Sequence, residues 1–215
     1  MQNASGKALR HFLTRIYDMS QGGQLGFGAE ASGLVLEVFM LADYFAVQRL
    51  ASAAIAALVA RAKAPRRQGR QGAPQAAIKL YCLAAVAGGV DELMTALRLE
   101  LEGPLTEALL LPLGAAISLD VSLLRVRAIL ADRVRSSWAK AQLALAWLAH
   151  DLGERRALAG GLLALVNWTD LTPPRMAWAR EIAHIMGLVH LESTLNELLE
   201  VEKALKARKR KREED

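Results

Sequence analysis

The segment SWAKAQLALAWLAHDL, residues 137–152, decides the fold class of this protein. One set of its apolar residues recurs at alternating steps of three and four, which is the spacing of one face of an α-helix: Trp138, Ala141, Leu145, Leu148 and Leu152. Ala and Leu, both good helix formers, occupy most of the segment. It therefore predicts a helix over 137–151 that packs through an apolar face.

The same pattern continues in both directions along the chain. Helices are expected to end near Tyr17, to start at the N-cap Ser32, and to cover 47–62, 75–87, 90–102, 122–133, 154–166, 173–187 and 191 onward. Glycine and proline separate them, as at Gly103-Pro104 and Thr172-Pro173-Pro174. Since the connections are short, successive helices should pair antiparallel. The expected fold is an all-α antiparallel bundle of stacked helical hairpins.

Composition and charge exclude several classes of protein. The 215 residues are 53% hydrophobic and 23% charged, so an intrinsically disordered chain is excluded. The net charge is +5, but residues 61–70 carry +5 and residues 203–215 carry +4. The rest of the chain is therefore mildly acidic. A uniformly basic domain that coats nucleic acid does not fit this distribution.

Cysteine content and apolar run length indicate the compartment. The single cysteine, Cys82, cannot form an internal disulfide, which fits a reducing environment. The uncharged apolar stretches 108–119 and 157–169 are shorter than the ~20 residues needed to cross a bilayer. Residues 1–10 lack the apolar core of a signal peptide. These features predict a protein of the cytoplasm or nucleus without a membrane span.

The sharpest change in composition is APRRQGRQGAP, residues 64–74, which holds two prolines, two glycines and no large apolar residue. Proline stops a helix and the like charges repel, so this segment is expected to be a basic flexible linker. The predicted organisation is a helical segment over 1–63, a helical domain over 75–190, and a C-terminal helix with a basic tail over 191–215.

Two segments carry a family resemblance. The run VLEVFMLADYFAVQRL, residues 35–50, resembles the last helical pair of BTB/POZ domains, and Phe12-Leu13 with Ile16-Tyr17 resembles the piece before that pair. The run from Ala144 through Asp151, followed by Glu154-Arg155, a leucine-rich helix and Leu171-Thr172-Pro173, resembles the BACK domain of kelch-type adaptors. The order of the two resemblances is that of the BTB-BACK adaptor family.

This resemblance implies a non-enzymatic adaptor or scaffold that serves a cullin-type ubiquitin ligase. It implies a partner groove around 36–50 and 78–99, in which apolar anchors bury a helix of the partner. The partner-binding residues that we expect are Leu36, Phe39, Met40, Tyr44 and Phe45. The chain lacks the first strands and helices of a BTB domain and all kelch blades, so BTB-type dimerisation and kelch-type substrate recognition are not expected.

The sequence shows no catalytic or metal-binding pattern, so neither an enzymatic activity nor a cofactor is expected. The four histidines lack HExxH spacing, and Cys82, between Leu80 and Leu83, is expected to be a buried structural thiol. His150-Asp151 falls at a helix C-terminus, where a structural role is favoured over a catalytic one. Core packing is the favoured role for most of the tryptophans. Trp138 is the exception, because Arg133, Arg135 and Lys140 are close in sequence.

The basic tail leaves alternatives open. Its cations are Lys206, Arg208, Lys209, Arg210, Lys211 and Arg212. Such a run is typical of a nuclear-import signal or a phosphate-binding arm, and it also suits a solvated helix end, where cations oppose the negative end of the helix dipole. The alternative function is therefore a nucleic-acid-binding helical protein that uses the basic linker and tail. A related protein that keeps the fold and only competes for a partner fits the sequence as well.

Overall fold

The computed structural model describes residues 5–23, 25–28, 30–63, 75–88, 90–109, 117–133 and 135–214. All regular structure in these ranges is helical, which confirms the all-α class. The chain divides into two compact units, Met1–Glu100 and Leu101–Asp215. The predicted linker 64–74 lies outside the described residues, so a domain boundary there stays a prediction.

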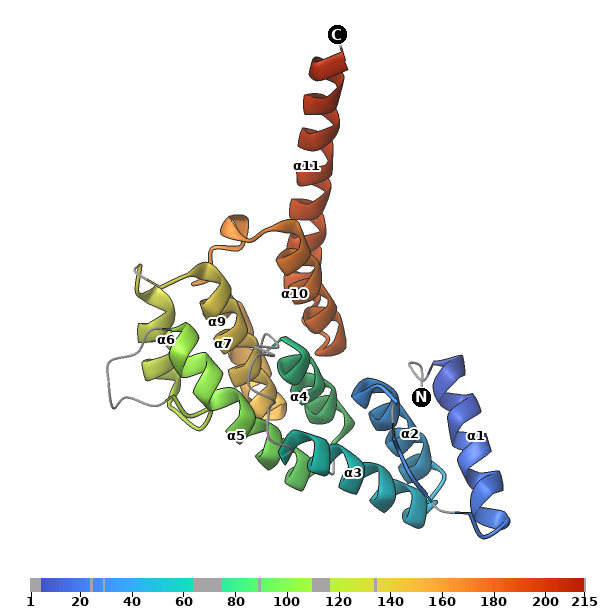
Figure 1. Ribbon diagram of the computed structural model, residues 1–215. Coiled ribbons are helices and arrows are strands. Elements are labelled where there is room, and N and C mark those ends of the chain that lie inside the picture. Colours follow the sequence, from blue (N-terminus) through green and yellow to red (C-terminus); the bar gives the residue numbers. More distant parts are fainter. Residues whose placement is uncertain are drawn as a thin grey trace. The chain divides into compact units, whose positions relative to one another are not determined.

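The first unit is built around one buried helix. It contains α1 (Gly6–Ser20), α2 (Ser32–Tyr44), α3 (Gln48–Lys63), α4 (Gln75–Ala87) and the first part of α5 (Asp91–Ala108). Helix α2 contacts α1, α3 and α4 (Figure 1). It is therefore buried on most of its circumference, through Leu34, Val35, Leu36, Val38, Phe39, Leu41 and Ala42.

Helices α1 and α2 end in the same way. At the end of α1, Gly22 has φ +75° and Gly23 N–H donates to the carbonyl of Asp18 at 2.8 Å. At the end of α2, Ala46 has φ +55° and Val47 N–H donates to the carbonyl of Ala42 at 2.7 Å. Both are Schellman caps, in which a left-handed residue turns the chain out of the helix. At the second cap an alanine takes the position that usually belongs to glycine.

The second unit is built around α7. It contains the rest of α5, then α6 (Leu123–Ala131), α7 (Ser137–His150), α8 (Leu152–Arg155), the 3₁₀ turn η1 (Arg156–Leu158), α9 (Ala159–Leu163), the 3₁₀ turn η2 (Trp168–Asp170), α10 (Pro173–Ile185) and α11 (Val189–Glu214). Helix α7 contacts α6, α8, α9, η2 and α10. Every residue from Ala139 to Ala149 is buried, so α7 is the core of this unit.

Two tryptophans and an arginine hold the segments around α7. The indole N–H of Trp147 donates to the carbonyl of Val121 at 2.9 Å, and that of Trp168 donates to the carbonyl of Leu163 at 3.0 Å. Arg155 donates to the carbonyls of Leu119 and Trp147 at 2.9 and 2.8 Å, with its guanidinium 4.1 Å from the centre of the Trp147 ring. The core-packing role predicted for Trp147 and Trp168 is confirmed, since both are buried.

Helices α10 and α11 pair through a third Schellman cap. Gly187 has φ +64°, and Leu188 N–H donates to the carbonyl of Ala183 at 2.8 Å. Among the described side chains of α11, the last buried one is Leu195. The red C-terminal part of this helix extends beyond α10 (Figure 1). Its outer turns are therefore held by helix propensity and by charge pairs along its own surface, such as Lys203 Nζ with Glu200 Oε1 at 2.6 Å.

Several expected helix boundaries differ from the structure; the first helix, expected to end near Tyr17, ends at Ser20. The N-cap of α2 is Ala31, without a side-chain cap, and Ser32 is the first helical residue. The helix expected to end at Glu102 continues through Pro104 to Ala108. Proline removes one main-chain hydrogen bond there, but Leu101 and Leu105 are fully buried one turn apart, and their burial keeps the helix continuous.

The helix expected over 154–166 is also wrong, because the chain forms α8, η1 and α9 in its place. Gly160 and Gly161 weaken a helix in this segment, and Arg155 turns back to bind carbonyls of other segments. In the part of the chain that the structure describes, no helix combines the length and the apolar character required to cross a membrane.

Candidate functional site

The structure separates the five expected partner-binding residues into two groups. Leu36 and Phe39 are 1% and 7% exposed and belong to the core of the first unit. Met40, Tyr44 and Phe45 are 40%, 65% and 50% exposed at the C-terminal end of α2. Only these last three are accessible to a partner. Where the groove was expected, helix α2 packs directly against α4. The buried residues of α4 include Ile78, Tyr81 and Cys82.

Helix α1 adds a second set of exposed apolar residues, which are not among the five expected partner-binding residues. Leu9, Leu13 and Tyr17 lie on one face of α1 and are 45%, 56% and 66% exposed. On the covered face of the same helix, Phe12 stacks on Phe45 with ring centroids 5.4 Å apart. Tyr44 meets Phe45 edge-on at 5.1 Å.

We call the exposed set on the two helices the α1–α2 surface: Leu9, Leu13, Tyr17, Met40, Tyr44 and Phe45. Helices α1 and α2 contact each other, and Phe12 on α1 stacks on Phe45 at the end of α2. Apolar exposure on this scale is typical of an interaction site.

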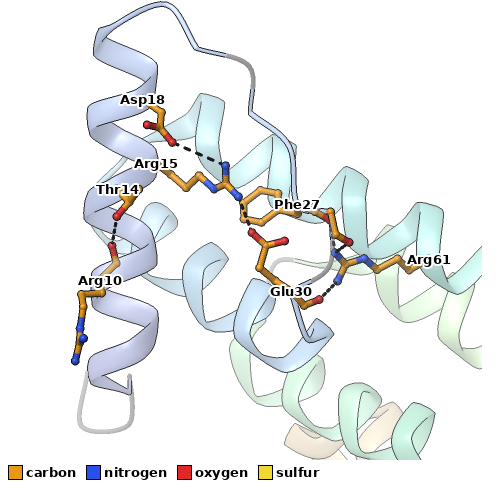
Figure 2. A network of polar contacts seen from close by, with 8 residues as sticks. Arg10, Thr14, Arg15, Asp18, Phe27, Glu30 and Arg61 are labelled. Carbon is orange, nitrogen blue, oxygen red and sulfur yellow. Dashed lines mark hydrogen bonds and ion pairs between the residues drawn. The ribbon is translucent and has the colours of Figure 1, made fainter.

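A polar network fixes the loop that follows α1 (Figure 2). Arg15 on α1 pairs with the Glu30 carboxylate at 2.5 Å, and its guanidinium lies 5.3 Å from the centre of the Phe27 ring. From α3, Arg61 donates to the main-chain carbonyls of Phe27, Gly28 and Glu30, with the bond to Glu30 at 2.7 Å. Arg61, which the sequence places next to the basic linker, is thus an internal anchor.

The same network has an electrostatic consequence at Glu30. A hydrogen bond from its own main-chain N–H, together with the Arg15 guanidinium, lowers the pKa of Glu30 from its ordinary value of 4.5 against the opposing effect of burial. The ionised carboxylate is therefore the form that holds the loop. Because this loop connects α1 to α2, the network helps to position the α1–α2 surface.

The basic tail is helical up to Glu214 in α11. Lys206 is exposed and its ammonium lies 3.8 Å from the Glu202 carboxylate, and Arg208 is exposed as well. The side chains of Lys209, Arg210, Lys211 and Arg212 lie outside the described part of the chain. Nuclear import and nucleic-acid binding by this tail both stay predictions.

A pocket in the second unit brings Trp138 together with cations. Its volume is about 440 Å³, and its lining comes from the start of α7, the preceding turn, η2 and the start of α10. We call it the Trp138 pocket, lined by Arg133, Arg135, Ser136, Ser137, Trp138, Lys140, Asn167, Asp170 and Arg175. The sequence indicated Arg133, Arg135 and Lys140. It gave no sign of Asn167, Asp170 or Arg175, which are distant in the chain.

Contacts within the Trp138 pocket are specific. The Arg175 guanidinium lies 5.2 Å from the centre of the Trp138 ring, and Trp178 meets that ring edge-on at 5.0 Å. The Ser137 hydroxyl donates to the Asp170 carboxylate at 2.8 Å. The Ser136 hydroxyl accepts the N–H of Ala139 at 3.1 Å and caps α7.

The contacts of Cys82, His150 and Asp151, which were considered for catalysis, are those of structural residues. Cys82 is fully buried, as expected, and burial raises the pKa of its thiol, which makes the thiolate scarce. His150 Nε2 lies 2.6 Å from the Asp120 carboxylate, whereas the neighbouring Asp151 caps α8 by accepting the N–H of Glu154 at 3.3 Å. Within the described residues, no group of three or more His, Cys, Asp and Glu side chains is placed to hold a metal ion.

The chain matches no family model, and neither the curated proteins nor the solved structures with which it was compared give a match.

Proposed function

We propose that this protein is a non-enzymatic adaptor or scaffold that binds a partner protein through the α1–α2 surface. The observation that carries the proposal is the exposure of six large apolar side chains on two helices that contact each other. Exposed apolar patches of this kind mark interaction sites, because their burial against a partner releases ordered water and is favourable.

The aromatic composition of the surface supports a protein partner. Tyr17 and Tyr44 each combine a large apolar ring with a hydroxyl, and aromatic side chains are enriched at the centres of protein interfaces. Phe45 lies between the two helices, stacked on Phe12 and in edge contact with Tyr44. Such an arrangement offers preformed anchors, so little side-chain entropy is lost when a partner binds.

The form of recognition that we propose is packing of an apolar helix face of the partner against the α1–α2 surface. Leu9, Leu13 and Tyr17 repeat every four residues and so present a ridge along α1. The resemblance to BTB-BACK adaptors adds a specific partner, a cullin scaffold. Membership of a ubiquitin ligase complex is thus the finer form of the proposal.

The test compares charge-introducing substitutions on and off the surface. Leu13→Asp and Tyr44→Asp change exposed positions, so the core of the first unit is expected to fold as before. Leu124→Asp is the matched control, because Leu124 is 80% exposed on α6 in the other unit. Binding of a purified cullin scaffold to the full chain is measured for each variant.

The proposal expects Leu13→Asp and Tyr44→Asp to weaken binding by about tenfold or more each, with Leu124→Asp unchanged. Absence of cullin binding by the wild-type chain removes the ligase role. The adaptor role is then tested by chemical cross-linking in cells: partners captured equally well by wild type and by Leu13→Asp contradict binding through the α1–α2 surface.

A further inference from the structure

Lys140 has an unusual environment in the second unit. It lies on the second turn of α7, is only 7% exposed, and lines the Trp138 pocket. Among the described residues, none forms a hydrogen bond or an ion pair with its ammonium group. Its carbon chain is buried, while the ammonium nitrogen reaches solvent in the pocket. Lys140 is therefore a cation that an anion entering the pocket can meet.

The surroundings of Lys140 increase the positive potential. Besides Lys140, three arginines and one carboxylate line the pocket: Arg133, Arg135, Arg175 and Asp170. Arg135 Nε is paired with Asp132 at 3.0 Å, and the Asp170 carboxylate already accepts the Ser137 hydroxyl. Even when Asp132 is included, positive charge exceeds negative charge by two.

The start of α7 contributes main-chain donors to the same place. The side chain of Ser136 satisfies the N–H of Ala139. The N–H groups of Ser137 and Trp138, in the first turn, have no acceptor within the helix. They add to the positive end of the helix dipole, which favours an anion in front of α7. The Lys140 ammonium and the helix terminus thus act on the same pocket.

A phosphate monoester suits this pocket better than a carboxylate does. Near neutral pH a phosphate monoester carries close to two negative charges and three acceptor oxygens, which balances the charge excess and offers acceptors to Lys140, Arg133 and the α7 terminus. A single carboxylate would leave one of these charges uncompensated. Arg133 and Arg175 are exposed residues of the pocket lining and are accessible to the incoming group.

The shape and lining favour a phosphorylated peptide as the source of that group. A pocket of about 440 Å³ holds more than a free phosphate ion. The Trp138 ring already has Arg175 against a face and Trp178 at its edge, which reduces the ring area open to a nucleobase. Asn167 and Ser137 can hydrogen-bond to peptide groups on either side of a phosphorylated residue.

We propose that the Trp138 pocket binds a phosphorylated serine or threonine side chain of a partner protein, with the Lys140 ammonium contacting the phosphate. The site lies in the second unit and is independent of the α1–α2 surface. It would let a phosphorylation event on a partner control its attachment to this protein.

The experiment measures binding to the full chain by titration calorimetry. The probes are a mixture of short peptides with a central phosphoserine and varied flanks, the same mixture unphosphorylated, inorganic phosphate, and a short single-stranded oligonucleotide. The expected result is that the phosphorylated mixture binds about tenfold or more tightly than each other probe. Equal binding of inorganic phosphate, or tighter binding of the oligonucleotide, overturns the proposal.

Two variants locate the binding. Lys140→Met keeps the length of the side chain and removes its charge, and Arg175→Gln changes an exposed position. Each is expected to weaken phosphopeptide binding by about tenfold. Arg180→Gln is the matched control on the same helix, outside the pocket, and should bind as wild type. Should Lys140→Met fail to fold, Arg175→Gln alone decides: wild-type affinity in that variant contradicts the site.

Discussion

Arg175, in the first turn of α10, places its guanidinium 5.2 Å from the centre of the Trp138 ring at the start of α7. Trp178, one turn further along α10, meets the same ring edge-on. The two helices are thus joined by a cation–π contact and an aromatic pair, and Arg175 and Trp138 both line the Trp138 pocket.

The Arg175–Trp138 contact should be measurable as a coupling free energy. A double-mutant cycle with Arg175→Gln and Trp138→Leu is expected to give about 0.5–1 kcal/mol, since the arginine is exposed and the contact is partly solvated. Urea unfolding followed by circular dichroism provides the four free energies of unfolding. A parallel cycle with Arg180→Gln and Trp138→Leu is the control. Strictly additive effects in the first cycle contradict a direct contact.

Ala46 should be a position where glycine stabilises the protein. With φ +55° it adopts the left-handed conformation that costs an L-residue about 1 kcal/mol. Ala46→Gly is expected to raise the free energy of unfolding by up to about 1 kcal/mol, less the added entropy of the unfolded chain. Ala56→Gly, at an exposed position inside α3, should lower it by about 1 kcal/mol. Thermal unfolding shows whether the two signs are opposite, as expected.

Removal of the Arg61 side-chain donors should loosen the loop before α2. Arg61→Met leaves the carbonyls of Phe27, Gly28 and Glu30 without this partner, so we expect a loss of about 2–3 kcal/mol in unfolding free energy. Arg49→Met, exposed on the same helix, is the control. Limited proteolysis should cut the variant faster within 21–31. Unchanged cleavage there would show that Arg61 does not hold the loop.

Glu30 should give the first unit an acid-sensitive contribution to stability. Its pKa is lower in the folded state than in the unfolded chain, so the ionised carboxylate stabilises the fold above about pH 4.5. This stabilisation is lost as the pH falls through the lowered folded-state pKa. Glu30→Gln is therefore expected to be less stable than wild type at neutral pH, with the difference shrinking in acid.

Urea unfolding at a series of pH values measures this difference. Arg15→Gln removes the partner of the carboxylate at 2.5 Å and should reproduce part of the effect. If the unfolding free energies of Glu30→Gln and wild type differ by a constant amount from neutral pH to acid pH, the stabilising role of the ionised Glu30 carboxylate is contradicted.

Local sequence patterns predicted the helices well where apolar periodicity and helix breakers agree. The range 75–87 is α4 as observed, and 137–151 differs from α7 by one residue. The prediction failed at Pro104 because a proline signal is local, whereas burial of Leu101 and Leu105 depends on contacts with other parts of the chain. Tertiary packing outweighed the local rule.

The candidate sites were predictable only in part. Leu36 and Phe39 are apolar residues on the same helix as Met40, and no periodicity separates a helix buried on most sides from one with an exposed face. In the Trp138 pocket, Lys140 lies two residues after Trp138, so the sequence alone indicated that the two are close. Arg175 and Asn167 belong to distant segments of the chain, so only the tertiary structure could show that they line this pocket.

The continuity of α5 through Pro104 has a consequence for dividing the chain. The division between the two units falls at Glu100 and Leu101, and Pro104 is the residue whose N–H would have bonded to the carbonyl of Glu100 in a regular helix. A fragment that begins at Leu101 would carry its proline in the first helical turn. Helices routinely begin with proline, because the N–H groups of the first turn have no acceptor. Residues 101–104, although they lie inside the continuous helix α5, thus have a sequence that also suits the first turn of a helix.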